Sequence, residues 1–293
     1  MIPEFENWLR FEKRSAENTV VSYISDLNQF NSFLHVNYPG IVIEKVNKLI
    51  IKSWIVSLMD KKFSPTSVNR KIVSLNTFYK FLLKETKIDK NPVSSILSPK
   101  RPHRIVKYLE EEEIIKILDE LEFGDDFEGV RDKLIIEMLY GTGVRLSELI
   151  GMKAVNLEVQ HGIVKVLGKR NKERIIPLNQ TLIKLLQEYI IIRETVAEGK
   201  DTEKLFLTAN GKPLYAMLVY RVVKKYVDQL IMRTHVSPHV LRHTFATHLI
   251  NRGADINAIK ALLGHANLAA TQIYTHNTVE RLKKVHKQAH PRG

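Results

Sequence analysis

The chain has 293 residues and carries 45 Lys and Arg against 32 Asp and Glu, a net charge of +13. It has no cysteine, which excludes disulfides, thiol nucleophiles and cysteine-ligated zinc. No apolar run approaches the roughly 20 residues of a membrane span, and the N-terminus lacks a signal-peptide pattern. We therefore expect a soluble, cytoplasmic protein without a membrane partner. The positive charge is compatible with a nucleic acid partner, but it can equally well serve solubility alone, so the net charge by itself does not decide between them.

Positive charge is concentrated in the first third of the chain. Residues 1–98 hold 14 Lys and Arg against 9 Asp and Glu, and residues 99–107 add four cations and no anion. The rest of the chain is nearly balanced. This distribution predicts a DNA-binding domain over 1–98, a basic linker over 99–107 and, over 108–293, a second domain whose main function is not DNA binding.

Apolar residues in the first part recur at helical spacing. One helix is predicted over residues 3–13, and a second begins with Ser15 as its N-cap. Asn47 is placed to cap a third helix, and Ser64-Pro65 opens a fourth. These features predict a compact, all-helical domain.

The predicted linker combines prolines, which stiffen it, with cations that can lie along DNA phosphates. These cations are Lys100, Arg101, Arg104 and Lys107. A solvated linker without a function is the alternative. We favour DNA contact because the cations gather where the two domains must hinge.

The second part combines helices with one short β-hairpin. An acidic stretch over 109–113 favours a helix start, and another helix follows over 127–140. Strands are predicted over 163–167 and 174–177, joined by a basic tip. Further helices are predicted over 179–197, 215–231, 238–251, 256–263, 268–274 and 278–288. The fold class is mainly α with a small β-sheet.

Arg145 begins a helix directly after a turn that contains Gly141 and Gly143. A guanidinium at this position can present two parallel N–H donors to a phosphate. Glu148 lies one turn further along and can orient it. An ordinary Arg–Glu helix pair is the alternative, and the segment by itself favours that alternative.

A second anion site is predicted where Ser237-Pro238 opens a helix. His239 lies in the first turn of this helix, and Arg242 follows on the same face. Helix N-termini already favour anions, so the two side chains would complete a phosphate pocket. A metal site is the alternative, because His239 and His243 are four residues apart and His248 is near. That site would lack the glutamate of a His-Glu-x-x-His motif.

The last candidate residues follow a helix stop at Gly264, which places His265 on a turn. Tyr274 comes nine residues later, and a lone tyrosine is usually a core or interface residue. The candidate set contains arginines, histidines, a hairpin lysine and this tyrosine, without the carboxylate cluster that two metal ions need. It favours a tyrosine nucleophile and direct stabilisation of a pentavalent phosphorus by positive side chains. We expect no metal and no other cofactor.

Five segments together resemble the tyrosine recombinases of the phage-integrase family, specifically the Xer type (XerC, XerD and XerA). They are residues 141–149, 168–174, 239–243, 263–265 and 272–276. The similarity also includes residues 17–19, 26–27 and 290–292, and so covers nearly the whole chain. Each segment is a weak indication by itself, but their joint order and spacing are highly specific.

The resemblance implies a role for each candidate. Arg145 and Arg242 would clamp the phosphate, and Lys169 would protonate the departing 5′ oxygen. His239 and His265 would be the hydrogen-bonding pair of the pocket, with His239 also a candidate to accept the tyrosine proton. Tyr274 would be the nucleophile, and its supporting acidic residue would be Glu148.

Two positions depart from the family pattern. Arg170 stands where the family often has glycine, and Val106 stands where a proline is common. The first departure leaves Lys172, on the same loop, as an alternative to Lys169. We also expect Arg170, Lys172 and Arg174 of this basic stretch to contact DNA.

The implied architecture is a two-domain DNA clamp. Residues 1–98 would be a four-helix, SAM-like core-binding domain, and residues 108–293 an α+β catalytic domain. The implied reaction passes through a 3′-phosphotyrosyl bond and a Holliday junction, without ATP, metal or another cofactor. Residues 278–293 would dock into a neighbouring protomer, although packing on their own domain is the alternative.

The implied partners follow from that reaction. The first is double-stranded DNA with a dif-like site. The second is a set of three further protomers, in a homo-tetramer or in a hetero-tetramer with a second Xer recombinase. In bacterial systems, an FtsK-type DNA translocase is a possible third partner. The use we expect is resolution of chromosome or replicon dimers. A phage or mobile-element integrase and a type IB topoisomerase-like enzyme share the chemistry, and the lack of an arm-binding domain before residue 1 favours the Xer type. A DNA-binding regulator without catalysis is disfavoured by the intact set of candidates.

Overall fold

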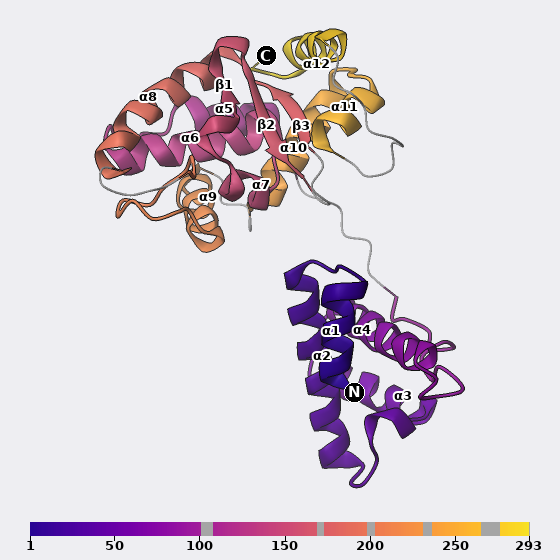
Figure 1. Ribbon diagram of the computed structural model, residues 1–293. Helices are drawn as coiled ribbons and strands as arrows, with labels where there is room; N and C mark the ends of the chain where they lie inside the picture. Colours follow the sequence, from indigo (N-terminus) through magenta and orange to yellow (C-terminus); the bar gives the residue numbers. More distant parts are fainter. Residues whose placement is uncertain (101–107, 169–172, 198–202, 231–235, 265–275, 293) are drawn as a thin grey trace. The chain divides into compact units, whose positions relative to one another are not determined.

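The computed structural model describes residues 1–100, 108–168, 173–197, 203–230, 236–264 and 276–292 (Figure 1). The chain divides into two compact units, Met1–Arg104 and Ile105–Gly293, and the division falls within the predicted linker. Of the predicted linker cations, Lys100 is described and is exposed, whereas Arg101, Arg104 and Lys107 lie outside the described residues. In the described part of the chain, no helix is long and apolar enough to cross a membrane.

The first unit is helical, as predicted. Asn47 caps a helix by accepting hydrogen bonds from the backbone N–H groups of residues 49 and 50, and the Ser64 hydroxyl caps the next helix. The predicted cap at Ser15 is wrong, because that helix begins one residue later, after Ala16, and has no side-chain cap. The elements are α1 (Ile2–Asn7) with the π-helical η1 (Trp8–Glu12), α2 (Glu17–Asn37), the 3-10 turn η2 (Ile43–Lys45), α3 (Lys48–Asp60) and α4 (Pro65–Lys84).

A buried carboxylate ties α2 to α4 in this unit. Asp26 is 1% exposed and accepts hydrogen bonds from Lys71 Nζ at 2.8 Å and Ser74 Oγ at 2.7 Å, and it also pairs with Arg70. A buried charge is costly unless it is paired in this way. The two helices are therefore held in one register around an aromatic core that includes Phe30.

The second unit is built around one central helix. This helix, α6, is buried on nearly all sides, including its charged residues Arg131, Asp132 and Glu137, and it packs against α5, α8, α9 and α10. The helices are α5 (Glu111–Asp119), α6 (Phe127–Thr142), α7 (Leu146–Gly151), α8 (Gln180–Ala197), α9 (Ala216–Leu230), α10 (Pro238–Asn251), α11 (Ile256–Leu263) and α12 (His276–Ala289). The predicted helix over 268–274 lies outside the described residues.

A three-stranded antiparallel sheet flanks α11 and α12. Its order is β1 (Leu157–Glu158), β2 (Ile163–Leu167) and β3 (Glu173–Pro177), with Val166 opposite Arg174. The predicted hairpin is confirmed, and the tip between its strands lies largely outside the described residues. β1 was not predicted because two residues are too few to show an alternating pattern.

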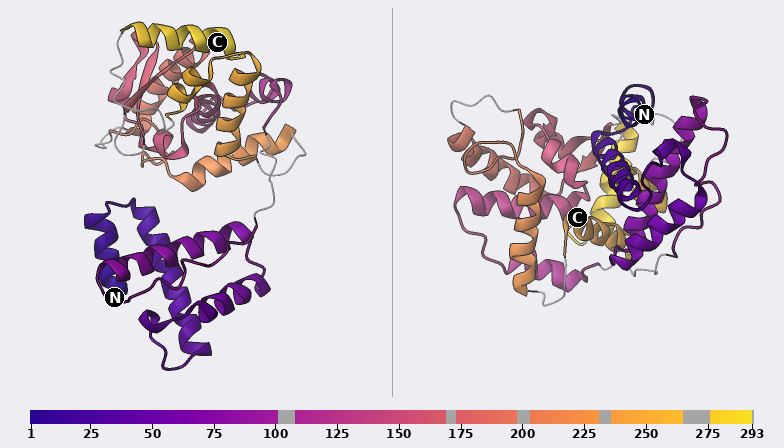
Figure 2. Two further views of the ribbon diagram at one scale, coloured as in Figure 1. Left: turned by 90° about the vertical axis from the view of Figure 1, so that its right-hand side faces the viewer. Right: turned by 90° about the horizontal axis from the view of Figure 1, so that it is seen from below.

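The C-terminal helix α12 packs on its own unit, against β3, α10 and α11 (Figure 2). Leu282 is 3% exposed within the main core, and His286 Nε2 lies 2.8 Å from the Gly141 carbonyl oxygen. The ring of His290 stacks on that of His286 with centroids 4.8 Å apart. Docking of residues 278–293 into a neighbouring protomer stays a prediction.

Candidate active site

The turn between α6 and α7 requires a glycine. Gly143 ends α6 in the left-handed conformation, with a φ of +60°, and a Cβ at this position would lie 2.5 Å from Phe245 Cδ1. Glycine therefore allows the end of α6 to approach α10 closely. The chain then enters α7 with Arg145 in extended conformation as its N-cap residue.

Glu148 holds both the backbone and the side chain of Arg145. Its Oε2 accepts from the Arg145 backbone N–H at 2.7 Å, which is the reciprocal half of a capping box, and its Oε1 accepts from Arg145 Nη1 at 2.8 Å. The Arg145 side chain remains 31% exposed. The structure thus contains the oriented Arg–Glu pair expected from the sequence, with the guanidinium accessible from solvent.

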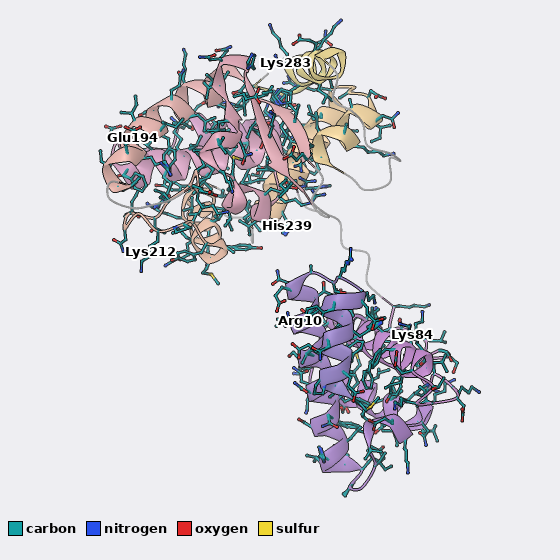
Figure 3. All side chains as sticks on the ribbon, in the orientation of Figure 1. Arg10, Lys84, Glu194, Lys212, His239 and Lys283 are labelled. Carbon is teal, nitrogen blue, oxygen red and sulfur yellow. The ribbon has the colours of Figure 1, made fainter. Side chains whose placement is uncertain are left out.

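The start of α10 brings the second predicted arginine to the same place. Pro238 opens this helix, and His239 is exposed in its first turn (Figure 3). Ser237 is the N-cap residue before Pro238, as predicted, but its hydroxyl makes no capping hydrogen bond. Arg242 donates to the carbonyl oxygens of Gly143 and Leu263, the latter at 2.7 Å.

Three arginines converge on the end of α11. Helix C-termini leave carbonyl groups without intrahelical partners, and here three consecutive ones accept from side chains of distant segments. Arg174 Nε donates to Leu262 O at 2.8 Å, Arg242 Nη2 to Leu263 O, and Arg145 Nη2 to Gly264 O at 3.1 Å. Gly264 ends α11 with a φ of +63°, as the predicted stop requires.

The structure therefore joins part of the predicted set and leaves part of it outside the described residues. Arg145, Glu148 and Arg242 meet at the turn that leads into His265. His265 itself and Tyr274 lie outside the described residues, as do the hairpin residues Lys169, Arg170 and Lys172.

Arg174 does not fit its predicted role as a DNA contact. It is 3% exposed, and its Nη1 and Nη2 donate to Glu148 Oε1 and Oε2 at 2.6 and 2.7 Å. The alternation of side chains along β3 explains why Arg174 is buried. Arg174 and Ile176 are two residues apart on β3, so both side chains point to the buried face. The charge of Arg174 suggested a DNA contact, whereas its position in the alternation of β3 indicates burial.

The described part of the site carries excess positive charge. The guanidinium groups of Arg145, Arg174 and Arg242 face the single carboxylate of Glu148. Burial, followed by the charges of Arg145 and Arg174, lowers the pKa of Arg242 to about 9, which still leaves it charged at neutral pH. Burial alone would raise the pKa of Glu148, but its hydrogen bonds to Arg174 and Arg145 hold it at about 2. An anion bound here would relieve the repulsion among the cations.

His248, considered above as a metal ligand, belongs to the core. Its Nδ1 lies 3.0 Å from Tyr140 Oη and its Nε2 lies 2.8 Å from the Leu109 carbonyl oxygen, so both ring nitrogens have partners. The residue is 1% exposed. Its function in the fold is to join α10 to α6 and to the segment before α5, a contact between distant segments that no local pattern could reveal.

Comparison with known proteins identifies the family. Residues 107–281 match the phage integrase family, and residues 2–86 match the phage integrase N-terminal SAM-like domain. The chain belongs to the phage integrase family. This confirms the predicted fold class, a helical, SAM-like N-terminal domain followed by a C-terminal domain of the integrase type.

Relatives of this integrase-family protein carry Xer names. Tyrosine recombinase XerC of Chlorobaculum tepidum is 36% identical over 99% of this chain and 94% of its own length. Tyrosine recombinase XerD of Staphylococcus epidermidis is 34% identical over 100% of this chain and 99% of its own length. The predicted resemblance to Xer-type tyrosine recombinases, which are DNA breaking and rejoining enzymes, is thereby confirmed.

Solved structures agree on the fold. The crystal structure of XerA recombinase is 27% identical, with a TM-score of 0.51, and the match covers 100% of this chain and 99% of that one. A structure of the XerH site-specific recombinase bound to a palindromic difH substrate has a TM-score of 0.71 at 22% identity, over 97% of this chain and 83% of that one. At this identity, the XerH similarity supports the fold alone.

Proposed function

We propose that this tyrosine recombinase cuts and rejoins DNA at a specific site, with Tyr274 as the nucleophile. The observation that carries the proposal is the convergence of Arg145 and Arg242, from distant segments, on the turn that leads into His265. Two guanidinium groups with excess positive charge around them suit a phosphate that gains negative charge as it becomes pentavalent. In this proposal, Lys169, His239 and His265 complete the pocket.

The proposed reaction exchanges one phosphate ester for another. Tyr274 Oη attacks the phosphorus, a 3′-phosphotyrosyl ester forms, and the bond from phosphorus to the 5′ oxygen breaks. His239 is the candidate to take the tyrosine proton, and Lys169 protonates the departing 5′ oxygen. A 5′ hydroxyl from a second strand then attacks the ester and releases Tyr274. Because each step conserves the ester, the reaction needs no ATP, and we propose that it needs no metal or other cofactor.

We further propose that the substrate is double-stranded DNA with a dif-like site. Four protomers would hold two sites and exchange strands through a Holliday junction, as a homo-tetramer or together with a second Xer recombinase. Resolution of chromosome or replicon dimers in the cytoplasm, with an FtsK-type translocase as a candidate activator, is the use we infer. The curated relatives named XerC and XerD support it.

Phosphate contacts outside the pocket would come from the basic linker and hairpin. The proposed residues are Lys100, Arg101, Arg104, Lys107, Arg170 and Lys172. Lys100 is exposed, as such a contact requires. Since contacts of this kind release counterions, DNA affinity should fall steeply as salt concentration rises.

A covalent trapping assay tests the proposal. The protein is incubated in EDTA with a duplex that carries the site and a nick next to the cleaved phosphate, so that the freed end diffuses away and the adduct accumulates. Wild type and Tyr220→Phe, which changes a partly exposed tyrosine on α9, should form a covalent protein–DNA adduct, and Tyr274→Phe should form none. No adduct with wild type, or equal adduct with Tyr274→Phe, would contradict the recombinase. Relaxation of supercoiled DNA without paired sites would instead favour a topoisomerase.

A further inference from the structure

We propose that Arg174 is a positioning residue that acts through Glu148 to hold Arg145 in place for the phosphate. This inference rests on the proposed function, because it assigns Arg145 to phosphate binding. Three donor atoms of Arg174 are already occupied inside the protein: Nε by Leu262 O, and Nη1 and Nη2 by the two oxygens of Glu148. With 3% of its surface exposed, Arg174 is placed to act on its neighbours and not on DNA.

Glu148 is the shared element between the two arginines. Its Oε1 accepts from Arg145 Nη1 at 2.8 Å and from Arg174 Nη1 at 2.6 Å. Its Oε2 accepts from the Arg145 backbone N–H and from Arg174 Nη2, both at 2.7 Å. A carboxylate offers about four acceptor positions, so all of them are filled. Removal of Arg174 would leave Glu148 bonded only to Arg145 itself, so the pair would lose its anchor to β3 and to the end of α11.

Arg174 also has an electrostatic effect on Glu148. Burial favours the protonated form of this carboxyl group and so raises its pKa, whereas the hydrogen bonds and charge of Arg174 are the largest influence in the opposite direction. Without Arg174, a larger fraction of Glu148 would be protonated in weak acid. A protonated Glu148 would attract the Arg145 guanidinium less strongly.

A second contact of Arg174 reaches the turn that precedes His265. Its Nε donates to Leu262 O, two residues before the Gly264 carbonyl that accepts from Arg145. A Cβ on Gly264 would lie 3.0 Å from Arg174 Cδ and 3.3 Å from its Nη1. The Arg174 side chain therefore lies directly against this turn. One buried side chain thus braces Arg145 and the chain leading into His265 at the same time.

The geometry requires arginine and not merely a positive charge. The guanidinium offers two parallel donors to Glu148 while its Nε faces another direction, toward Leu262. A lysine ammonium is a single point of charge and cannot fill these three positions together. Arg174→Lys is therefore the informative variant, because it keeps the charge and removes the planar fork.

The test compares Arg174→Lys with a matched buried arginine. Arg131 on α6 is 1% exposed and hydrogen-bonds to Asp132 and Glu128 of its own helix, so Arg131→Lys is the control. Single-turnover cleavage of the nicked duplex is measured over a range of DNA concentrations, below the unfolding transition of each variant. We expect Arg174→Lys to lower the cleavage rate constant by about 100-fold with less than about a three-fold change in DNA affinity, and Arg131→Lys to leave the rate constant unchanged.

A pH profile separates positioning from a merely structural effect. The acidic limb of the rate profile should move to higher pH in Arg174→Lys, because Glu148 loses the partner that keeps it ionised. Loss of folded protein would scale the whole profile down without moving this limb. A rate constant within about two-fold of wild type, an unmoved limb, or an equal loss in Arg131→Lys would overturn the proposal.

One measurement tests the inference even if wild type forms no covalent adduct. In ¹⁵N NMR of the free protein, the Nε–Hε signal of Arg145, assigned through Arg145→Lys, should be sharp in wild type and broadened or shifted in Arg174→Lys. The same signal should be unchanged in Arg131→Lys. An unchanged Arg145 signal in Arg174→Lys would overturn the positioning role, whereas a missing adduct in wild type would overturn only the proposed function.

Discussion

Arg174 and Glu148 form a buried, two-pronged ion pair, with Nη1 to Oε1 at 2.6 Å and Nη2 to Oε2 at 2.7 Å. The side chains are 4% and 3% exposed, so neither charge is solvated to any useful extent. A pair of this kind stabilises little relative to apolar residues of the same size, but the loss of one partner leaves the other charge buried alone. The pair therefore makes the site sensitive to single substitutions.

Glu148→Gln should destabilise the protein strongly. The glutamine would leave the Arg174 charge uncompensated and would direct an N–H₂ group at one of its donors, so we expect a loss of about 3–5 kcal/mol in the free energy of unfolding. Urea denaturation at pH 7 measures it. The control is Glu111→Gln, which breaks a more exposed pair with Arg252 and should cost less than about 1 kcal/mol. Equal losses in the free energy of unfolding of the two variants would show that the buried pair is no more important for stability than the exposed pair.

Gly264→Ala should cost more than Gly253→Ala. Both glycines have positive φ, +63° and +78°, so an alanine at either one loses about 1–2 kcal/mol of backbone energy. A Cβ at Gly253 meets no atom within 4 Å, whereas one at Gly264 meets Arg174, which three hydrogen bonds hold in place. We expect the Gly264 variant alone to lose cleavage rate as well. Thermal unfolding and the trapping assay check both points, and similar behaviour of the two variants would contradict the tight contact.

Much of the fold could be predicted because its causes are local. Asn47 and Ser64 cap helices through side chains that lie next to the N–H groups they satisfy, and Gly264 ends a helix through its own backbone freedom. The start at Ser15 was misplaced by one residue because a good capping side chain stood one position too early. Local chemistry identifies an element more reliably than its boundary.

The sequence identified residues of the site, but it could not predict which of them contact one another. Arg145, Glu148 and Arg242 could be named from motif and helix position. Their meeting at the carbonyl groups of residues 262–264 depends on how α7, α10, β3 and α11 pack, which no single segment determines. Arg174 shows this best. Its position two residues before Ile176 in a predicted strand already indicated burial, but its charge on a basic hairpin led to the prediction of a DNA contact.

The choice between Lys169 and Lys172 as general acid can be made chemically. A 5′-phosphorothiolate substrate has a leaving group that needs no proton, so it should restore cleavage by the variant that lacks the acid. We expect Lys169→Ala to cleave the ordinary nicked duplex slowly and the phosphorothiolate duplex at close to the wild-type rate. Rescue of Lys172→Ala and not of Lys169→Ala would move the role to Lys172.

Glu137 should make stability fall between weakly acidic and neutral pH. It is 0% exposed on α6, and neither of its oxygens has a hydrogen-bond partner among the described residues. Arg292 Nη2 lies 3.2 Å from its Oε1 without the geometry of a hydrogen bond. Burial raises the pKa of Glu137 from 4.5 to about 7, against the attraction of Arg292. The folded protein therefore holds this proton more tightly than the unfolded chain, so its stability decreases as pH rises from about 4.5 through 7.

Urea denaturation at pH 5 and pH 8 measures this effect as a difference between variants. Glu137→Gln keeps the shape and cannot ionise, so its advantage over wild type should grow by up to about 3 kcal/mol between the two pH values. The comparison is needed because burial lowers the pKa of His286 and His290, which makes stability rise with pH in the same range in both proteins. Glu188→Gln, at an exposed position on α8, should show no change in its difference from wild type. A difference for Glu137→Gln that stays constant from pH 5 to pH 8 would mean that Glu137 ionises normally in the folded protein.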